Sequence, residues 1–233
     1  LHTVFSRVDE HGEDEPIEET DHALDRWGAL WNKNSFPIEP IKAYLHTQHE
    51  KFWLFHPERP FGQALSAAKG TEYSAAKLIG ELSESSNKIR LFPPRTGKDK
   101  TEISYAEAAR WLLYVNGYDD TSAKPKGKNL PSPGAGWLGK LGLITAKGKT
   151  LFETLMLNLV LLKEDYEPWE PNVPAWELPK AREGERIEIT IPDNPAALLT
   201  LQSRRLLLER NNHKVTGYRL LGGDFFLQRK CLQ

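Results

Sequence analysis

Hydrophobic side chains recur every three or four residues in four segments of the chain, which predicts four helices. These segments lie near residues 21–31, 37–52, 104–117 and 150–162. Two of them begin with a residue pair at capping-box spacing, Ser104 with Glu107 and Thr150 with Glu153. The last segment contains few polar residues, so we expect its helix to be buried on most of its sides.

A different pattern near the end of the sequence predicts strands. Arg186–Ile191 alternates polar and apolar residues, and two largely apolar segments follow, separated by Asn211 and Asn212. We interpret these two segments as a hairpin over residues 198–221. Helices combined with a short hairpin region predict the α+β class, in which several helices form a mixed globular domain with a small antiparallel sheet.

Glycine and lysine are concentrated in a basic segment, residues 121–149. Gly134, Gly136, Gly139 and Gly142 fall within a short span, and glycine lets another surface approach the backbone closely. Lysines surround this span, and a partner that needs close approach and positive charge is most simply a phosphate-bearing one. A flexible surface loop with solvated lysines explains the same residues. The spacing does not match a Walker A loop.

A second basic segment lies near residues 87–103, where an aromatic residue is flanked by cations and prolines. Phe92 precedes Pro93 and Pro94, and Arg95 and Lys98 follow. This composition suits a base stacked on Phe92 beside phosphates. The alternative is an exposed basic loop with Phe92 packed in the core.

A third group of cations lies near the predicted hairpin. These cations either form a third basic patch or are solvated charges at the edge of a sheet. The group consists of Arg204, Arg205, Arg210 and Lys214.

Overall composition restricts the class of protein. The apolar and charged fractions of the 233 residues are ordinary for a soluble globular protein, and the net charge of −1 means that any nucleic acid must be bound by local patches. The single cysteine, Cys231, excludes a disulfide framework and favours a cytoplasmic location. Neither a signal peptide nor a membrane-spanning run is visible. Because the sequence starts at Leu1 and stops in an apolar region, we expect it to be a fragment.

Catalytic and metal-binding patterns are not found in the sequence. There is no G-x-S-x-G motif, no thiol–histidine arrangement and no carboxylate cluster typical of a metal nuclease. His46 and His49 have a spacing compatible with metal binding, but further ligands do not accompany them. The acidic segment 9–21 is typical of a solvated loop. We therefore predict a non-catalytic protein without a metal or another cofactor.

Seven motifs occur in an order that resembles one known family, the large subunit of the type I-E CRISPR surveillance complex Cascade, called CasA. The motifs cover nearly the whole chain, and the aromatic-rich first one followed by LFETL..N is the most specific. They lie at residues 29–63, 86–95, 106–118, 134–142, 151–160, 174–177 and 198–210. The resemblance implies that residues 1–233 are a fragment of the N-terminal domain, without the family's C-terminal helical bundle.

The resemblance implies that the protein recognises the protospacer-adjacent motif in double-stranded target DNA from the minor groove. Backbone at Gly134, Ala135 and Gly136 would lie against the groove floor. Lys140 would hold phosphates, and Lys214 would enter the groove.

It also implies contact with RNA through the second basic segment, where Phe92, Arg95 and Lys98 would bind the 5′ handle of the CRISPR RNA. Other implied partners are the remaining Cascade subunits and the helicase–nuclease effector, with no membrane. Two alternatives stay open: a structural subunit that contacts only CRISPR RNA and neighbouring subunits, and an enzyme such as a nuclease.

Overall fold

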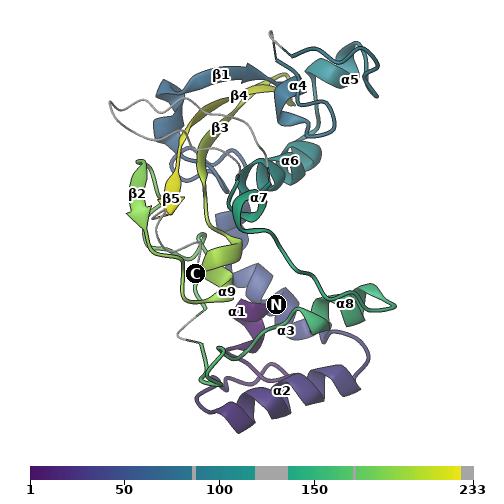
Figure 1. Ribbon diagram of the computed structural model, residues 1–233, viewed down its shortest axis with the longest axis vertical. Helices are drawn as coiled ribbons and strands as arrows, with labels where there is room; N and C mark the ends of the chain where they lie inside the picture. The colour runs from purple at the N-terminus through teal and green to yellow at the C-terminus, as the bar shows by residue number, and fades with distance from the viewer. Residues whose placement is uncertain (86–87, 119–135, 170–171, 227–233) are drawn as a thin grey trace. The chain divides into compact units, whose positions relative to one another are not determined.

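The computed structural model describes residues 1–85, 88–118, 136–169 and 172–226, and it divides the chain into two compact units (Figure 1). We call the first the helical unit, which consists of Leu1–Lys51, Ile144–Leu178 and Ile191–Thr200. The second, the sheet unit, consists of Phe52–Leu143, Pro179–Thr190 and Leu201–Gln233. Each unit is therefore assembled from segments that are distant in the sequence.

The helical unit is built on short helices around one apolar core. Its helices are α1 (His2–Phe5), α2 (Thr20–Asn32), α3 (Ile38–Thr47), α8 (Leu151–Leu157) and α9 (Pro195–Leu199), and the 3-10 helix η1 (His49–Phe52) follows α3. Phe5, Leu30 and Met156 are fully buried in the core. Trp27 and Trp31, one turn apart on α2, stack with their ring centroids 5.1 Å apart. Trp27 also donates a hydrogen bond to the carbonyl of Met156 at 3.1 Å, which joins α2 to α8.

The sheet unit contains the strands of the described chain and a helix of 13 residues. Its helices are η2 (Leu65–Lys69), α4 (Ala75–Leu78), α5 (Lys98–Thr101), α6 (Tyr105–Gly117) and α7 (Trp137–Leu141). Its strands are β1 (Thr71–Ser74), β2 (Arg186–Ile189), β3 (Arg204–Asn211), β4 (Lys214–Gly222) and β5 (Asp224–Phe226). The order β1-β4-β3 forms an antiparallel sheet, visible in Figure 1, and β2 pairs in parallel with β5. Apolar residues of α4 and α6 pack with the sheet in one core.

These elements confirm the predicted α+β class and most of the predicted helices. The Ser104 hydroxyl accepts a hydrogen bond from the amide of Glu107 at 3.2 Å, and that of Thr150 accepts one from Glu153 at 3.1 Å. Both capping pairs were predicted from spacing alone, because a cap depends on residues that are adjacent in sequence. No helix in the described part of the chain is both long and apolar enough to cross a bilayer.

The predicted helix over 150–162 and the predicted hairpin over 198–221 need correction. The first ends at Leu157, and its apolar side chains are not buried on most sides, since Leu151 is 74% exposed. The predicted hairpin begins too early, because its first residues, 198 and 199, belong to helix α9. The Asn194 side chain caps this helix and Pro195 occupies its first turn. The first strand of the hairpin begins only at Arg204.

The acidic segment 9–21 is ordered rather than simply solvated. Arg26, whose side chain is only 1% exposed, donates hydrogen bonds to the backbone carbonyls of Phe5, Val8 and Glu15. It also pairs with the Glu15 carboxylate at 2.6 Å. The buried guanidinium therefore anchors the segment to α2.

Candidate nucleic-acid interface

Lys214 is the exposed first residue of β4, directly after the turn of the β3–β4 hairpin. The turn lies at Asn212 and His213, one residue later than predicted, because Asn211 still pairs with Lys214. Asn212 and His213 have φ angles of 45° and 62°, the left-handed conformation that tight hairpin turns require. Lys214 is exposed, and the next residue, Val215, is fully buried and pairs with Ile103. The hairpin therefore projects a cation from a firmly held base.

The neighbouring cation Arg210 is held against the sheet unit. Its guanidinium carbon lies 4.5 Å from the centroid of the Phe55 ring, and it donates a hydrogen bond to the Tyr105 hydroxyl at 3.3 Å. Such cation–π stacking fixes the position of the side chain. Arg210 thus stiffens the hairpin next to Lys214.

The second basic segment presents Phe92 to solvent. The Phe92 side chain is 93% exposed and Leu91 is 90% exposed, so the alternative that Phe92 packs in the core is wrong. Lys98 is exposed at the start of α5, after Gly97, whose φ of 54° gives the turn that glycine favours. Exposed aromatic and cationic side chains in one loop can provide a stacking surface for a base.

Arg95, by contrast, is engaged within the protein. It forms ion pairs with Glu81 and with Glu107, the latter at 2.5 Å. Burial by itself would raise the pKa of Glu107. Hydrogen bonds from Arg95 and Trp111 nevertheless hold that pKa below its usual range. The structure thus separates Arg95 from Phe92 and Lys98, with which the sequence grouped it.

The glycine-rich segment is only partly visible. Gly134 and Ala135 lie outside the described residues, and so do the lysines at positions 124–128. Gly136 is the N-cap of α7, and a Cβ added there would lie 2.4 Å from the carbonyl carbon and oxygen of Gly117. The absent side chain therefore has a structural reason, the close packing of α7 on the end of α6. Lys140 lies within α7.

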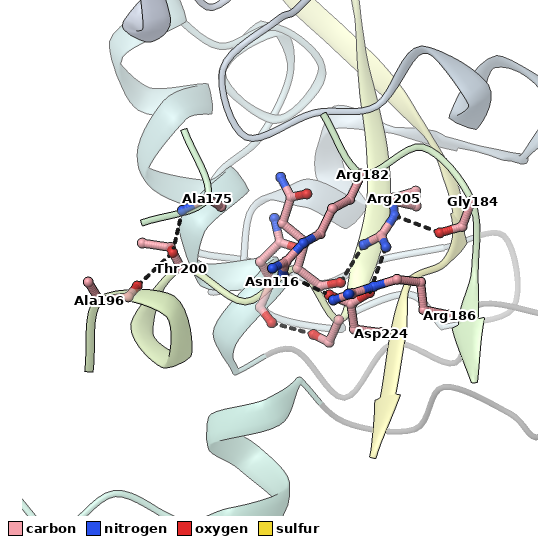
Figure 2. Close-up of polar contacts among 11 residues, drawn as sticks. Asn116, Ala175, Arg182, Gly184, Arg186, Ala196, Thr200, Arg205 and Asp224 are labelled. Atoms are coloured by element: carbon pink, nitrogen blue, oxygen red, sulfur yellow. Dashed lines mark hydrogen bonds and ion pairs between the residues drawn. The ribbon is translucent and has the colours of Figure 1, made fainter. Parts of the chain in front are cut away.

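Two cations of the third basic group are not at the surface. Arg204 and Arg205 are 0% and 1% exposed. Figure 2 shows Arg182, Arg186 and Arg205 directed toward the carboxylate of Asp224. Although burial would raise its pKa, the neighbouring arginines hold the pKa of Asp224 below its usual range.

The three arginines bind this carboxylate unequally. Arg205 Nη2 lies 2.6 Å from Asp224 Oδ1, and Arg186 Nε lies 2.7 Å from the same oxygen. Arg182 Nη1 is more distant, 3.4 Å from Oδ2. Arg205 also donates to the backbone carbonyls of Gln202 and Gly184. This cluster was missed from the sequence, although charged residues within apolar strand segments are a signal for buried pairs.

Two polar residues of the quoted motifs serve the fold. Gln63 is buried, donates to the carbonyl of Leu54 and accepts from the amide of Leu208 on β3. Glu177 pairs with Arg7 at 2.8 Å and accepts a hydrogen bond from the Tyr44 hydroxyl at 2.5 Å. These contacts account for polar positions in the motifs without a nucleic acid.

The described residues do not form a recognisable metal-binding site. Within the described ranges, no three side chains of the metal-ligating acid, histidine or cysteine types come together. His46 and His49 are both exposed. Three of the predicted contact residues are exposed in the described part of the chain. They are the aromatic Phe92 and the lysines Lys98 and Lys214.

Comparisons with known proteins agree on one family. Residues 1–228 match the profile of the family described as CRISPR-associated protein Cse1. The chain is 34% identical over 168 residues to CRISPR-associated protein CasA/Cse1 of Thermus thermophilus, and the match covers 66% of this chain and 30% of that relative.

Solved structures show the same fold. Thermobifida fusca Cse1 matches with a TM-score of 0.67 and 28% identity, over 88% of this chain and 40% of its own length. A chain of a CRISPR RNA-guided surveillance complex in a pre-nicking state matches with a TM-score of 0.66 over 98% of this chain and 45% of its own. At 22% identity that second likeness shows the fold alone. The chain thus spans less than half the length of these relatives, and by its profile match over residues 1–228 it belongs to the CRISPR-associated Cse1 (CasA) family.

Proposed function

We propose that this chain is the N-terminal part of the non-catalytic large subunit of a type I-E Cascade complex. The observation that carries the proposal is the Cse1 family match over residues 1–228. In this role the protein reads the protospacer-adjacent motif in double-stranded target DNA, while the CRISPR RNA reads the rest of the target by base pairing. The complex would act in the cytoplasm and recruit the helicase–nuclease effector.

Recognition of the motif takes place from the minor groove. Lys214, the exposed first residue of β4 after the hairpin turn, supplies a long donor for the acceptors on the groove floor. Gly134 and Ala135 bring bare backbone to the same groove, and Lys140 binds phosphates. Gly136 supports this segment through its contact with Gly117. Because minor-groove patterns are degenerate, we expect several motif sequences to be accepted.

The second basic segment contacts the 5′ handle of the CRISPR RNA. Phe92 is almost fully exposed and supplies a face on which an unpaired base can stack. Lys98 lies exposed beyond the same turn and is available to a phosphate.

The test of motif recognition uses the full-length protein assembled with its partner subunits and a guide RNA. Binding is compared for duplexes with and without a proper adjacent motif. We expect Lys214→Ala to reduce the preference for the motif by about tenfold, the effect of losing one base contact. Lys69→Ala, a matched change at another exposed lysine of the sheet unit, should leave the preference unchanged.

An unchanged preference in Lys214→Ala would remove the minor-groove role of this residue. If the complex without the protein discriminated equally well, the chain would instead be a structural subunit that contacts only RNA and its neighbours.

A further inference from the structure

We call residues 88–103 the basic loop, and two of its five cationic side chains, Arg95 and Lys100, are already ion-paired with carboxylates of the sheet unit. Arg95 is paired with Glu81 and Glu107. Lys100 is paired with Glu84, and the Arg90 guanidinium donates to the carbonyl of Leu82 at 2.7 Å. Within the described residues, the exposed ammonium groups of Lys88 and Lys98 form no ion pair.

Glu84 ties the two ends of the basic loop together. Its side chain is only 4% exposed, and one carboxylate oxygen accepts the backbone amide of Arg90 at 3.1 Å. The other oxygen binds the ammonium group of Lys100. A single buried carboxylate therefore fixes the entry and the exit of the loop, since each oxygen holds one end.

Arg95 fixes the middle of the loop between two carboxylates that come from different segments. Glu81 follows α4, and Glu107 lies in the first turn of α6, where it also accepts a hydrogen bond from Trp111 at 3.2 Å. The Arg95 side chain is 26% exposed, and the ion pairs raise the pKa of its guanidinium further even though burial opposes this. The charge of Arg95 is thus neutralised at close range before any nucleic acid arrives.

Besides the exposed cations Lys88, Arg90 and Lys98, the basic loop offers a partner an apolar tip. Ile89, Leu91 and Phe92 are 72%, 90% and 93% exposed, next to Pro93 and Pro94, which restrict the backbone after Phe92. A loop anchored at three points and stiffened by two prolines loses little conformational entropy when it binds. The exposed apolar side chains are therefore presented in a fixed position.

We propose that Arg95 is a positioning residue that holds this apolar tip against an unpaired base of the guide RNA, and that it makes no phosphate contact itself. The proposal rests on the RNA contact proposed above and replaces the direct role that the family resemblance implied for Arg95. Phosphate contacts from the basic loop then come from its exposed cations Lys88, Arg90 and Lys98. Stacking, which salt screens little, supplies most of the loop's affinity for RNA.

The experiment measures the affinity of the full-length protein for the guide RNA carried by its partner subunits, between about 50 and 200 mM salt. A phosphate contact to single-stranded RNA adds about 0.7 to the slope of log affinity against log salt. We expect Arg95→Ala to weaken binding about tenfold with the slope unchanged. Lys98→Ala should reduce the slope by about 0.7. A reduced slope in Arg95→Ala would overturn the proposal.

Glu81→Gln provides a second test that does not depend on the folding of Arg95→Ala. Glu81 is partly exposed, so its substitution leaves the core intact. If Arg95 positions the tip, loss of this carboxylate weakens RNA binding. If Arg95 is a phosphate ligand, the same change frees it and strengthens RNA binding, which would overturn the proposal.

Phe92→Ala separates failure of this inference from failure of the RNA contact itself. We expect a loss of about tenfold or more in RNA affinity, the effect of one lost base stack. If Phe92→Ala and Lys98→Ala both leave RNA affinity unchanged, the basic loop does not bind RNA. If Phe92→Ala weakens assembly with the partner subunits equally in the absence of RNA, the tip binds an apolar protein surface instead.

Discussion

At the scale of single residues, buried charges decide which segments are held together. Arg26 organises the acidic segment of the helical unit, and Asp224 gathers three arginines in the sheet unit. Removing one partner of a buried pair leaves the other uncompensated, which costs far more than the pair itself contributes. These two positions are therefore the most sensitive charged sites that we identify.

Asp224→Ala should lower the free energy of unfolding by about 3–5 kcal/mol, because Arg205 would remain buried without its counter-ion. Asp99→Ala, at an exposed position of α5, serves as the control and should change stability by no more than about 0.5 kcal/mol. Urea denaturation of both variants measures the difference. Equal stabilities for the two variants would show that Arg205 is satisfied without the carboxylate.

His2 should make the helical unit sensitive to mild acid. Burial lowers the pKa of His2 to about 4, and its Nε2 accepts the amide hydrogen of Val160 at 3.1 Å. The unfolded chain, with an ordinary histidine pKa near 6.5, binds the proton more readily. Stability is therefore complete above about pH 6.5 and falls as the pH decreases toward 4.

The measurement is urea denaturation of wild type and His2→Gln between about pH 7 and 4.5. We expect wild type to lose on the order of 2 kcal/mol across this range, while the variant loses clearly less. A parallel decline in both proteins would assign the acid sensitivity to other groups.

At the scale of elements, features that depend on neighbouring residues were predicted well from the sequence. Features that depend on tertiary packing were not. Ser104 and Thr150 cap their helices as expected, because the bonds join residues three apart. The length of α8 and the burial of Arg205 depend on which distant segments pack there, and a single sequence does not contain that information. The ion pairs of Arg95 were not predicted for the same reason, since its partners Glu81 and Glu107 lie on other segments. A contact of Arg95 with RNA stays a prediction.

Gly136→Ala should destabilise the sheet unit by about 1–3 kcal/mol, because the new methyl group would overlap the backbone of Gly117. Gly28→Ala is the control, since nothing lies within 4 Å of its added Cβ and it is inside α2. That change should be neutral or stabilising by up to about 1 kcal/mol. Thermal denaturation of both variants measures these changes in stability. A neutral Gly136→Ala would show that α7 can move away from α6.

At the scale of the whole molecule, the chain combines two compact units with exposed side chains suited to nucleic acid. Composition and periodicity predicted an α+β protein without a catalytic pattern, and the order of seven motifs indicated the family that the profile match confirms. Neither composition nor periodicity would have named that family. The residues that read DNA stay predictions, because Gly134 and Ala135 lie outside the described residues and the chain spans less than half of its solved relatives.

The most direct test of the central claim reconstitutes the surveillance complex with and without the full-length protein. Binding is then measured to target duplexes that do or do not carry an adjacent motif. We expect the complete complex to prefer duplexes with the motif, and the complex without this protein to lose the preference while it retains its guide RNA. An equal preference in both complexes would contradict the proposed role in motif recognition.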